Sequence, residues 1–380
     1  MIDTKSFLNG LEISGIQFVT GVPDSLLREV CACITDNFGP RQHITATNEG
    51  SAIGLAIGHH LATGRPALVY MQNSGLGNAV NPITSLVDPK VYGVPMILMI
   101  GWRGELQEDE TQVHDEPQHV KQGSVTLAQL DILGIPYIVI NAKTTAIETV
   151  LKKAVADAMA RSGPVALVVR KNTFAQYAIE ETIQNEHQLT REESIHQIIS
   201  QLPAQTVIVS TTGMASRELF ELRKQMGGKH QQDFLTVGGM GHASQIAMGI
   251  AISQRSDTVV CIDGDGAVLM HSGALAVSAD CSNLLHIVLN NGAHDSVGGQ
   301  ITKGSVLRFD CIASAFGYKH VASTNTKEDL REKLAVMIDL KGSRLLEVCC
   351  KRGARKNLGR PDRSPQQNKL DIMNFLSLTK

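Results

Sequence analysis

Short apolar runs alternate with segments of helix length along most of the chain. In the first half the runs are IQFVTG, PALVYMQ, PMILMIG, YIVINA and VALVVRK, and in the second half they are TVIVSTTG, DFLTVGG, TVVCIDG, LLHIVLNN and RLLEVCC. Their richness in β-branched residues is typical of strands, and strands that alternate with helices are typical of parallel sheets built from βα units. The pattern therefore predicts an α/β fold with a helix-flanked parallel sheet in each half.

The two halves also resemble each other. The stretch EGSAIGLAIGHHLATGRPALVYMQNSG, which starts at Glu49, and the stretch MGHASQIAMGIAISQRSDTVVCIDGDG, which starts at Met240, share a small-residue helix, a loop, an apolar strand and a glycine turn. We interpret this as two similar α/β domains in tandem, residues 1–180 and 181–380, joined by a polar linker around residues 178–194. Chance similarity between two α/β segments of like composition is the alternative.

Composition excludes several classes of protein. The chain has 380 residues, of which 43% are apolar and 19% charged, and its net charge of -2 argues against nucleic acid as a main partner. Its first residues lack the pattern of a signal peptide, and its longest apolar runs are too short for a membrane span. The seven cysteines lack a metal-binding spacing, apart from one C-x-C and one adjacent pair, and read as reduced thiols. We therefore expect a cytoplasmic protein.

The stretch CIDGDGAVLM places Asp265 between Gly264 and Gly266, directly after an apolar strand. Glycines let a backbone approach a ligand closely, the following helix offers N–H groups to an anion, and a carboxylate suits Mg²⁺. Asn291 follows 26 residues later, at the end of the next predicted strand. Adjacent strand ends can bring both side chains to one ion. A simple turn at the glycines is the alternative.

This GDG…NN pattern closely resembles the cofactor motif of thiamine diphosphate enzymes. The resemblance implies that Asp265 and Asn291 bind Mg²⁺ through their side chains and Ala293 through its carbonyl. It also implies that Gly266 and Ala267 meet the diphosphate of the cofactor. Cofactor-binding roles are expected as well for Gly264 and for Gly213, which lies in the glycine turn of STTGMASRELFE.

Two further residues match the same family. Glu49, in TATNEGSAIGLAIG, matches the glutamate that hydrogen-bonds the aminopyrimidine ring and helps to deprotonate the thiazolium carbon. Buried against that ring, it should have a raised pKa. Met240, between two glycines, matches the bulky residue that bends the cofactor. A solvated glutamate and an ordinary core methionine are the alternatives.

The two-domain layout, without room for a third domain, resembles the family of phosphonopyruvate and sulfopyruvate decarboxylases. The stretches YMQNSGLGNAVNPITSL, PMILMIGWRGE, DEPQHVKQG, NNGAHDSVGGQ and KNLGRP carry the resemblance, which runs essentially end to end. It implies decarboxylation of 3-phosphonopyruvate to phosphonoacetaldehyde and CO₂, a step toward 2-aminoethylphosphonate. It also implies a homodimer or higher homo-oligomer, with sites at the subunit interface. Sulfopyruvate decarboxylation, carboligation and a non-catalytic cofactor-binding module are the alternatives, whereas the absence of G-x-G-x-x-G disfavours a nicotinamide enzyme.

The chemistry needs a cationic pocket for the phosphonate and an acid for the enamine. We expect catalytic roles for Glu49, His294, Asp24 and His114. Related decarboxylases often carry the acidic residue one position later, where this chain has Ser25. Weaker candidates, each of which is polar and near a predicted strand end or in the C-terminal segment, are Asn73, Ser74, Arg103, Asp115, His119, Lys121, Arg352, Arg355, Arg360 and Arg363.

Overall fold

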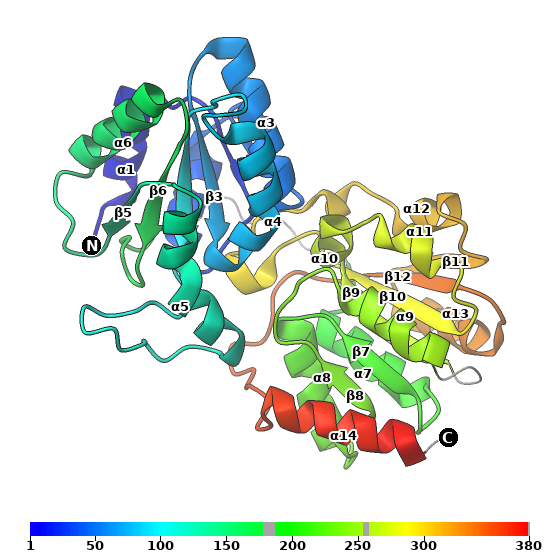
Figure 1. The fold of residues 1–380 in the computed structure, drawn as a ribbon. Coiled ribbons are helices and arrows are strands. Elements are labelled where there is room, and N and C mark those ends of the chain that lie inside the picture. The colour runs from blue at the N-terminus through cyan, green and yellow to red at the C-terminus, as the bar shows by residue number, and fades with distance from the viewer. Residues whose placement is uncertain (178–186, 254–257, 379–380) are drawn as a thin grey trace. The chain divides into compact units, whose positions relative to one another are not determined.

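The chain folds into two compact units, Met1–Ile183 and Gln184–Lys380, each built around its own sheet (Figure 1). The computed structural model describes residues 1–177, 187–253 and 258–378. The predicted domain boundary, between residues 180 and 181, lies outside the described residues.

The first unit contains a six-stranded parallel sheet in the order β2-β1-β3-β4-β6-β5. Its strands are β1 Val19–Gly21, β2 His43–Thr45, β3 Ala67–Gln72, β4 Met96–Gly101, β5 Tyr137–Ile140 and β6 Pro164–Val169. Its helices are α1 Thr4–Ile13, α2 Arg28–Asn37, α3 Glu49–Thr63, α4 Leu76–Pro82, α5 Pro117–Ile132 and α6 Ile147–Arg161, with short turns η1 Asn73–Gly75 and η2 Ile83–Val87.

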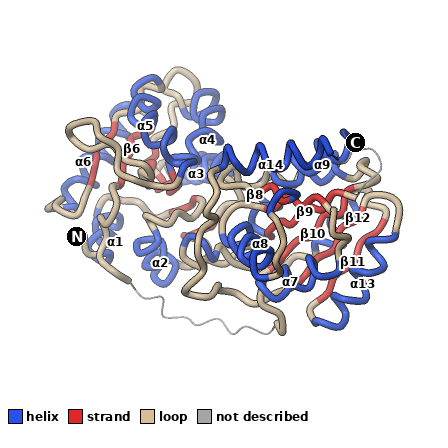
Figure 2. The backbone as a smooth tube through the Cα atoms, turned by 90° about the horizontal axis from the view of Figure 1, so that it is seen from below, coloured by secondary structure: helices blue, strands red, loops and turns tan. Residues whose placement is uncertain are grey.

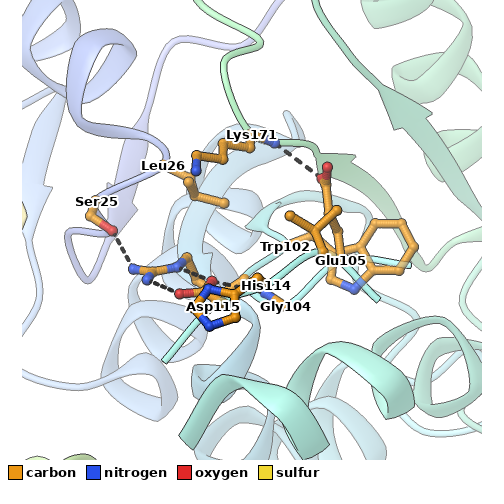
Figure 3. A pocket seen from close by; sticks show the side chains of 10 residues that line it. Ser25, Leu26, Trp102, Gly104, Glu105, His114, Asp115 and Lys171 are labelled. Atoms are coloured by element: carbon orange, nitrogen blue, oxygen red, sulfur yellow. Dashed lines mark hydrogen bonds and ion pairs between the residues drawn. The ribbon is translucent and has the colours of Figure 1, made fainter. Parts of the chain in front are cut away.

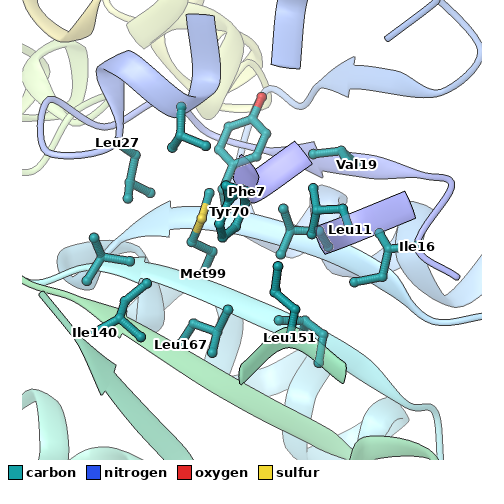
Figure 4. Packing of buried hydrophobic residues seen from close by; sticks show 14 of the residues in the cluster. Phe7, Leu11, Ile16, Val19, Leu27, Tyr70, Met99, Ile140, Leu151 and Leu167 are labelled. Carbon is teal, nitrogen blue, oxygen red and sulfur yellow. The ribbon is translucent and has the colours of Figure 1, made fainter. Parts of the chain in front are cut away.

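Both faces of this sheet are buried. Leu68 and Tyr70 of β3 belong to a core cluster with residues of α1, α2 and α6, of which Phe7, Leu11 and Leu151 are drawn in Figure 4. Val69 and Met71 point to the opposite face and belong to a second cluster, which is covered by α3 and α4. A strand that is buried on both faces reads as a continuous apolar run, which explains why the sequence pattern is so clear at β3, β4 and β6.

The second unit contains another parallel sheet of six strands, in the order β11-β12-β10-β9-β7-β8. Its strands are β7 Val207–Ser210, β8 Asp233–Leu235, β9 Val259–Gly264, β10 Leu284–Asn290, β11 His320–Thr324 and β12 Arg344–Cys349. Its helices are α7 Arg191–Gln201, α8 Met214–Gln225, α9 Ala243–Ser253, α10 Asp265–Met270, α11 Ala274–Ser278, α12 Phe309–Ala315, α13 Lys327–Asp339 and α14 Pro365–Leu378, with short turns η3 His230–Gln232, η4 Asp295–Val297 and η5 Lys303–Ser305. In Figure 2, α9 and α14 lie on the same side of the second sheet, and their apolar residues share one core cluster.

The two sheets have the same topology. Read from the β8 edge, the second sheet runs β8-β7-β9-β10-β12-β11, which repeats the order of the first sheet strand for strand. The prediction of two similar α/β domains, each with a helix-flanked parallel sheet, is confirmed.

The sequence pattern missed two strands and misplaced one end of the linker. The strands β2 and β11 were not predicted, because both are edge strands with half-buried residues and therefore lack a continuous apolar run. The linker was predicted to reach residue 194, which is wrong, because α7 already begins at Arg191. Among the described residues, no helix is long and apolar enough to cross a membrane.

Candidate active-site residues

Asp265 lies where β9 ends and α10 begins, and its side chain is only 2% exposed. The Thr302 hydroxyl and the backbone N–H of Asn291 donate to its carboxylate. Within the described part of the chain no basic side chain pairs with it, and burial raises the pKa of Asp265 to about 6. A buried carboxylate of this kind gains most from a nearby cation, so its environment fits a divalent metal.

Asn291 follows β10, the neighbour of β9 in the sheet. Its Nδ2 donates to Asp295 Oδ2 at 2.6 Å, and its Oδ1 accepts from the Ala293 N–H at 3.2 Å. Because the amide nitrogen is held by a carboxylate, the amide oxygen is the atom that can act as a metal ligand. Backbone N–H bonds thus join Asn291 to Asp265 and Ala293 to Asn291, and the role of these residues as Mg²⁺ ligands stays a prediction.

A network anchors Asp295 in turn. Its Oδ2 also accepts from Arg191 Nη1 at 2.8 Å and from the Gly353 N–H at 2.9 Å. Arg191 forms two further bonds to Glu218, at 2.8 and 2.9 Å, and both side chains are buried. Second partners of this kind orient the ligands of metal sites.

Gly266 lies against Met240 and His294. A Cβ added at Gly266 would lie 2.8 Å from His294 Cε1 and 3.3 Å from the methyl group of Met240, so only glycine fits there. Burial lowers the pKa of His294 to about 4, which keeps its imidazole neutral at neutral pH. Gly213 has a φ of 91° at the start of α8, and a Cβ there would lie 3.6 Å from Ser296.

In the first unit, Glu49 is the first residue of α3, and the helix is capped by Asn48, whose Oδ1 accepts from the Ser51 N–H at 2.8 Å. The Glu49 side chain is 5% exposed and accepts from Asn78 Nδ2 at 2.8 Å. A Cβ at Gly75 would come within 2.5 Å of Glu49 Oε1, so the carboxyl is packed tightly against the turn after β3. Burial raises the pKa of Glu49, as the sequence analysis expected of a buried carboxyl.

Asp24 lies in the loop after β1 and is fully buried. It accepts from Gln72 Nε2 at 2.8 Å and from the Leu26 N–H at 2.9 Å. Burial raises its pKa to about 6, although the positive charge of Arg103 acts in the opposite direction. A carboxyl with this pKa can hold a proton close to neutral pH.

A cavity of about 220 Å³ lies over the carboxyl ends of β1, β4 and β6 (Figure 3). Arg103 donates to Asp115 through Nε at 2.7 Å and Nη2 at 2.5 Å, and to Ser25 Oγ through Nη1 at 2.8 Å. Ligands of open α/β sheets bind at this edge. The polar side chains that line the cavity are those of Ser25, Arg103, Glu105, His114, Asp115 and Lys171.

Comparison with known proteins identifies the family. Residues 4–130 match the thiamine pyrophosphate enzyme N-terminal TPP binding domain, and residues 211–348 match the C-terminal TPP binding domain. A phosphonopyruvate decarboxylase of Streptomyces viridochromogenes is 33% identical over 97% of this chain and 93% of its own length. The chain belongs to the phosphonopyruvate decarboxylase family. The predicted class, a thiamine diphosphate-dependent decarboxylase with one cofactor-binding domain in each half, is confirmed.

Two other relatives of this decarboxylase help to define the family. A phosphonopyruvate decarboxylase of Streptomyces hygroscopicus is 32% identical over 97% of this chain and 92% of its own length. A sulfopyruvate decarboxylase of Methanosarcina acetivorans is 28% identical over 84% of each chain. The similarity therefore extends, at lower identity, to enzymes named for a sulfonate.

The remaining predicted residues of the decarboxylase have varied surroundings. Asn73 is buried and positions Arg103, since its Nδ2 donates to the Arg103 carbonyl at 2.9 Å. His119 is buried and does not line the cavity, and burial lowers its pKa to about 4. Ser74 and Lys121 are exposed.

Among the C-terminal arginines, Arg355 pairs with Glu192 and Glu221, and Arg363 pairs with Asp371. Arg352 donates to the Asn291 carbonyl at 3.3 Å.

The sequence did not reveal Arg191, Asp295 and Thr302 as parts of the site. Arg191 was assigned to the linker, and its buried bonds to Glu218 and Asp295 join segments that are far apart in the sequence. Asp295 carried a usable signal, because it lies four residues beyond Asn291 in the same loop.

Proposed function

We propose that this decarboxylase converts 3-phosphonopyruvate to phosphonoacetaldehyde and CO₂, a step in phosphonate biosynthesis. The observation that carries the proposal is its similarity to a phosphonopyruvate decarboxylase over 97% of its own length and 93% of the relative. Activity depends on the site rather than on the fold, so the residues described above must supply the chemistry.

The second unit supplies the cofactor-binding residues. Mg²⁺ would be held by the side chains of Asp265 and Asn291 and by the Ala293 carbonyl. Gly213, Gly264, Gly266 and Ala267 would lie at the diphosphate, and Met240 would press on the thiazolium ring. The buried Asp265 carboxylate and the open space beside the Gly264 Cα support this assignment. When bound, thiamine diphosphate supplies an electron sink for the electrons that the departing CO₂ leaves behind.

Glu49 would exchange a proton with the aminopyrimidine ring. Its burial and its raised pKa support this role, because burial makes the carboxylate a better proton acceptor than an exposed one. The bond from Asn78 Nδ2 orients the Oε2 atom of the carboxyl.

Three residues are candidates for protonation of the enamine. Asp24 can hold a proton up to about pH 6 on its carboxyl. His114 is exposed at the cavity, and His294 is neutral beside Gly266 and could donate an imidazole N–H. Asp24 is a better candidate than His294, because burial raises the pKa of Asp24 to about 6, whereas burial lowers the pKa of His294 to about 4.

A homodimer with sites at the subunit interface is the minimum assembly that we propose. The family site combines the pyrimidine domain of one subunit with the diphosphate domain of another. Sulfopyruvate decarboxylase alpha and beta subunits of Methanococcus maripaludis match 33% and 50% of this chain, respectively, whereas here both kinds of domain are on one chain. We also propose a cytoplasmic location, since the seven cysteines are free thiols.

Sulfopyruvate is the second candidate substrate, because the Methanosarcina acetivorans relative is similar over 84% of the chain. The two acids differ in charge, since a phosphonate can carry two negative charges and a sulfonate only one.

The test is CO₂ release by the purified protein with thiamine diphosphate and Mg²⁺ on phosphonopyruvate, sulfopyruvate and pyruvate. We expect the highest kcat/KM for phosphonopyruvate, and a loss of roughly 100-fold or more in Glu49→Gln. A higher kcat/KM for sulfopyruvate would assign the protein to the sister activity. No CO₂ from any of the three acids would contradict the proposal.

A further inference from the structure

The cavity over the ends of β1, β4 and β6 combines a rigid guanidinium with a second cation and a hydroxyl. We infer that this cavity binds the phosphonate group of the substrate, with Arg103 and Lys171 as its two cationic contacts. The inference rests on the proposed function, and it names the residues that select an anionic tail.

Hydrogen bonds fix the orientation of the Arg103 guanidinium group. The two bonds to Asp115 and the bond to Ser25 hold the plane of the guanidinium, and Asn73 holds its backbone. These bonds use three of the five N–H groups of the side chain. The other two N–H groups can donate to phosphonate oxygens at little cost in side-chain entropy, because the side chain is already ordered.

Lys171 provides the second cation. It follows β6, and its backbone N–H donates to Glu105 Oε2 at 3.1 Å, which anchors the residue at the cavity. In Figure 3 its side chain extends toward Leu26, while the Glu105 carboxylate lies on the other side of the backbone anchor. The neighbouring Arg170 packs against residues that line the cavity. Its Cζ lies 5.3 Å from the centroid of the Trp102 ring, and its Nη1 lies 3.9 Å from Glu105 Oε1.

Two cations line the cavity, and each has an acidic neighbour. Asp115 pairs with Arg103, which also attracts Asp24, while Glu105 lies 3.9 Å from Arg170 and also attracts Lys171. The guanidinium of Arg103 and the ammonium of Lys171 are the groups of this cavity that can bind an anion. His114, at the same cavity, can add a hydrogen bond. The cavity volume of about 220 Å³ equals the volume that roughly seven water molecules occupy in the liquid. This volume is large enough for a phosphonate group.

Steady-state kinetics of Lys171→Met test the inference first, since this side chain is exposed and its loss should not disturb folding. We expect KM for phosphonopyruvate to rise by roughly 10- to 100-fold with kcat changed little. Arg103→Lys, which keeps the charge but cannot form the same fork, should raise KM by a similar factor. Lys153→Met, on the exposed side of α6, is the matched control and should behave as wild type.

A binding measurement separates this inference from the proposed function. Methylphosphonate, which carries only the phosphonate group, is titrated into the full-length holoenzyme and followed by ³¹P NMR. We expect binding to wild type and to Lys153→Met, and at least 10-fold weaker binding to Lys171→Met and Arg103→Lys.

Each outcome has a distinct meaning. Binding of methylphosphonate that depends on Lys171, in a protein that does not turn over phosphonopyruvate, would support the cavity and refute the proposed function. Turnover of phosphonopyruvate with unchanged KM in both variants would overturn the cavity and leave the function standing. Failure of the wild-type protein to bind methylphosphonate would also overturn the cavity.

Discussion

Asp295 shows how one side chain can control a site without being one of its predicted ligands. Its Oδ2 accepts hydrogen bonds from Arg191, from Asn291 and from the Gly353 N–H. The position of the Asn291 amide therefore depends on a carboxylate that is itself held by a buried arginine. In a metal site, such a partner sets which atom of the amide faces the ion.

We predict that Asp295→Asn weakens Mg²⁺ binding by roughly 10- to 100-fold, because the new amide cannot accept from Arg191 and Asn291 as a carboxylate does. The measurement is calorimetry of thiamine diphosphate binding at increasing Mg²⁺ concentration, which needs no turnover. Asp339→Asn, at the exposed end of α13, is the control. An unchanged Mg²⁺ dependence would show that Asp295 does not orient Asn291.

Asp24 should make stability depend on pH in an unusual direction. Burial raises its pKa from 3.8 to about 6, so the native state keeps a proton that the unfolded chain has already released. Since the native state binds more protons within this window, the free energy of unfolding should fall as pH rises from about 4 to 6.

We therefore predict that wild type loses roughly 3 kcal/mol relative to Asp24→Asn between pH 4 and pH 7, as the shift of about two pKa units implies. Urea unfolding of both proteins at several pH values measures this difference. A difference in free energy that does not vary with pH would contradict the raised pKa.

At the scale of the element, the start of α7 shows why a polar helix end was mistaken for a linker. The α7 helix begins with a capping box, in which the Thr190 hydroxyl accepts from Glu193 N and the Glu193 carboxylate accepts from Thr190 N. This segment is polar, and so it was assigned to the linker. Its apolar residues Ile195, Ile198 and Ile199 are nevertheless buried in the core of the second unit.

We predict that Thr190→Ala lowers the free energy of unfolding of the second unit by about 1 kcal/mol, because the N-terminus of α7 loses its side-chain cap. Thr190→Ser keeps the hydroxyl and should retain most of the stability. Thermal or urea unfolding measures both variants, and kcat should stay close to that of wild type. Equal stability of Thr190→Ala and Thr190→Ser would mean that the capping box does not stabilise the protein.

At the scale of the whole molecule, the same topology serves two tasks. The first unit positions Glu49 after β2 and the second unit positions Asp265 after β9, each at the carboxyl end of its own sheet. Neither unit alone contains both the predicted proton-exchanging glutamate and the predicted metal ligand. The proposed homodimer would combine them across subunits.

We predict that Glu49→Gln and Asp265→Asn, each inactive alone, recover activity when mixed and allowed to exchange subunits. Random dimers would contain about one quarter of sites with both native residues. The readout is CO₂ release from the mixture, with analytical ultracentrifugation to establish the assembly. A dimer that exchanges subunits without any recovery would show that each site uses a single chain.

The sequence by itself determined the α/β class, the tandem repeat and the predicted cofactor motif, because these depend on local patterns. Buried parallel strands give apolar runs, and glycines mark the turns where Asp265 and Glu49 lie. Only the tertiary structure decided which distant residues meet them. Arg191 reaches Asp295, Thr302 reaches Asp265, and the ends of three separated strands form the cavity around Arg103. Such contacts depend on packing between segments far apart in the chain, and a local pattern carries no signal for them.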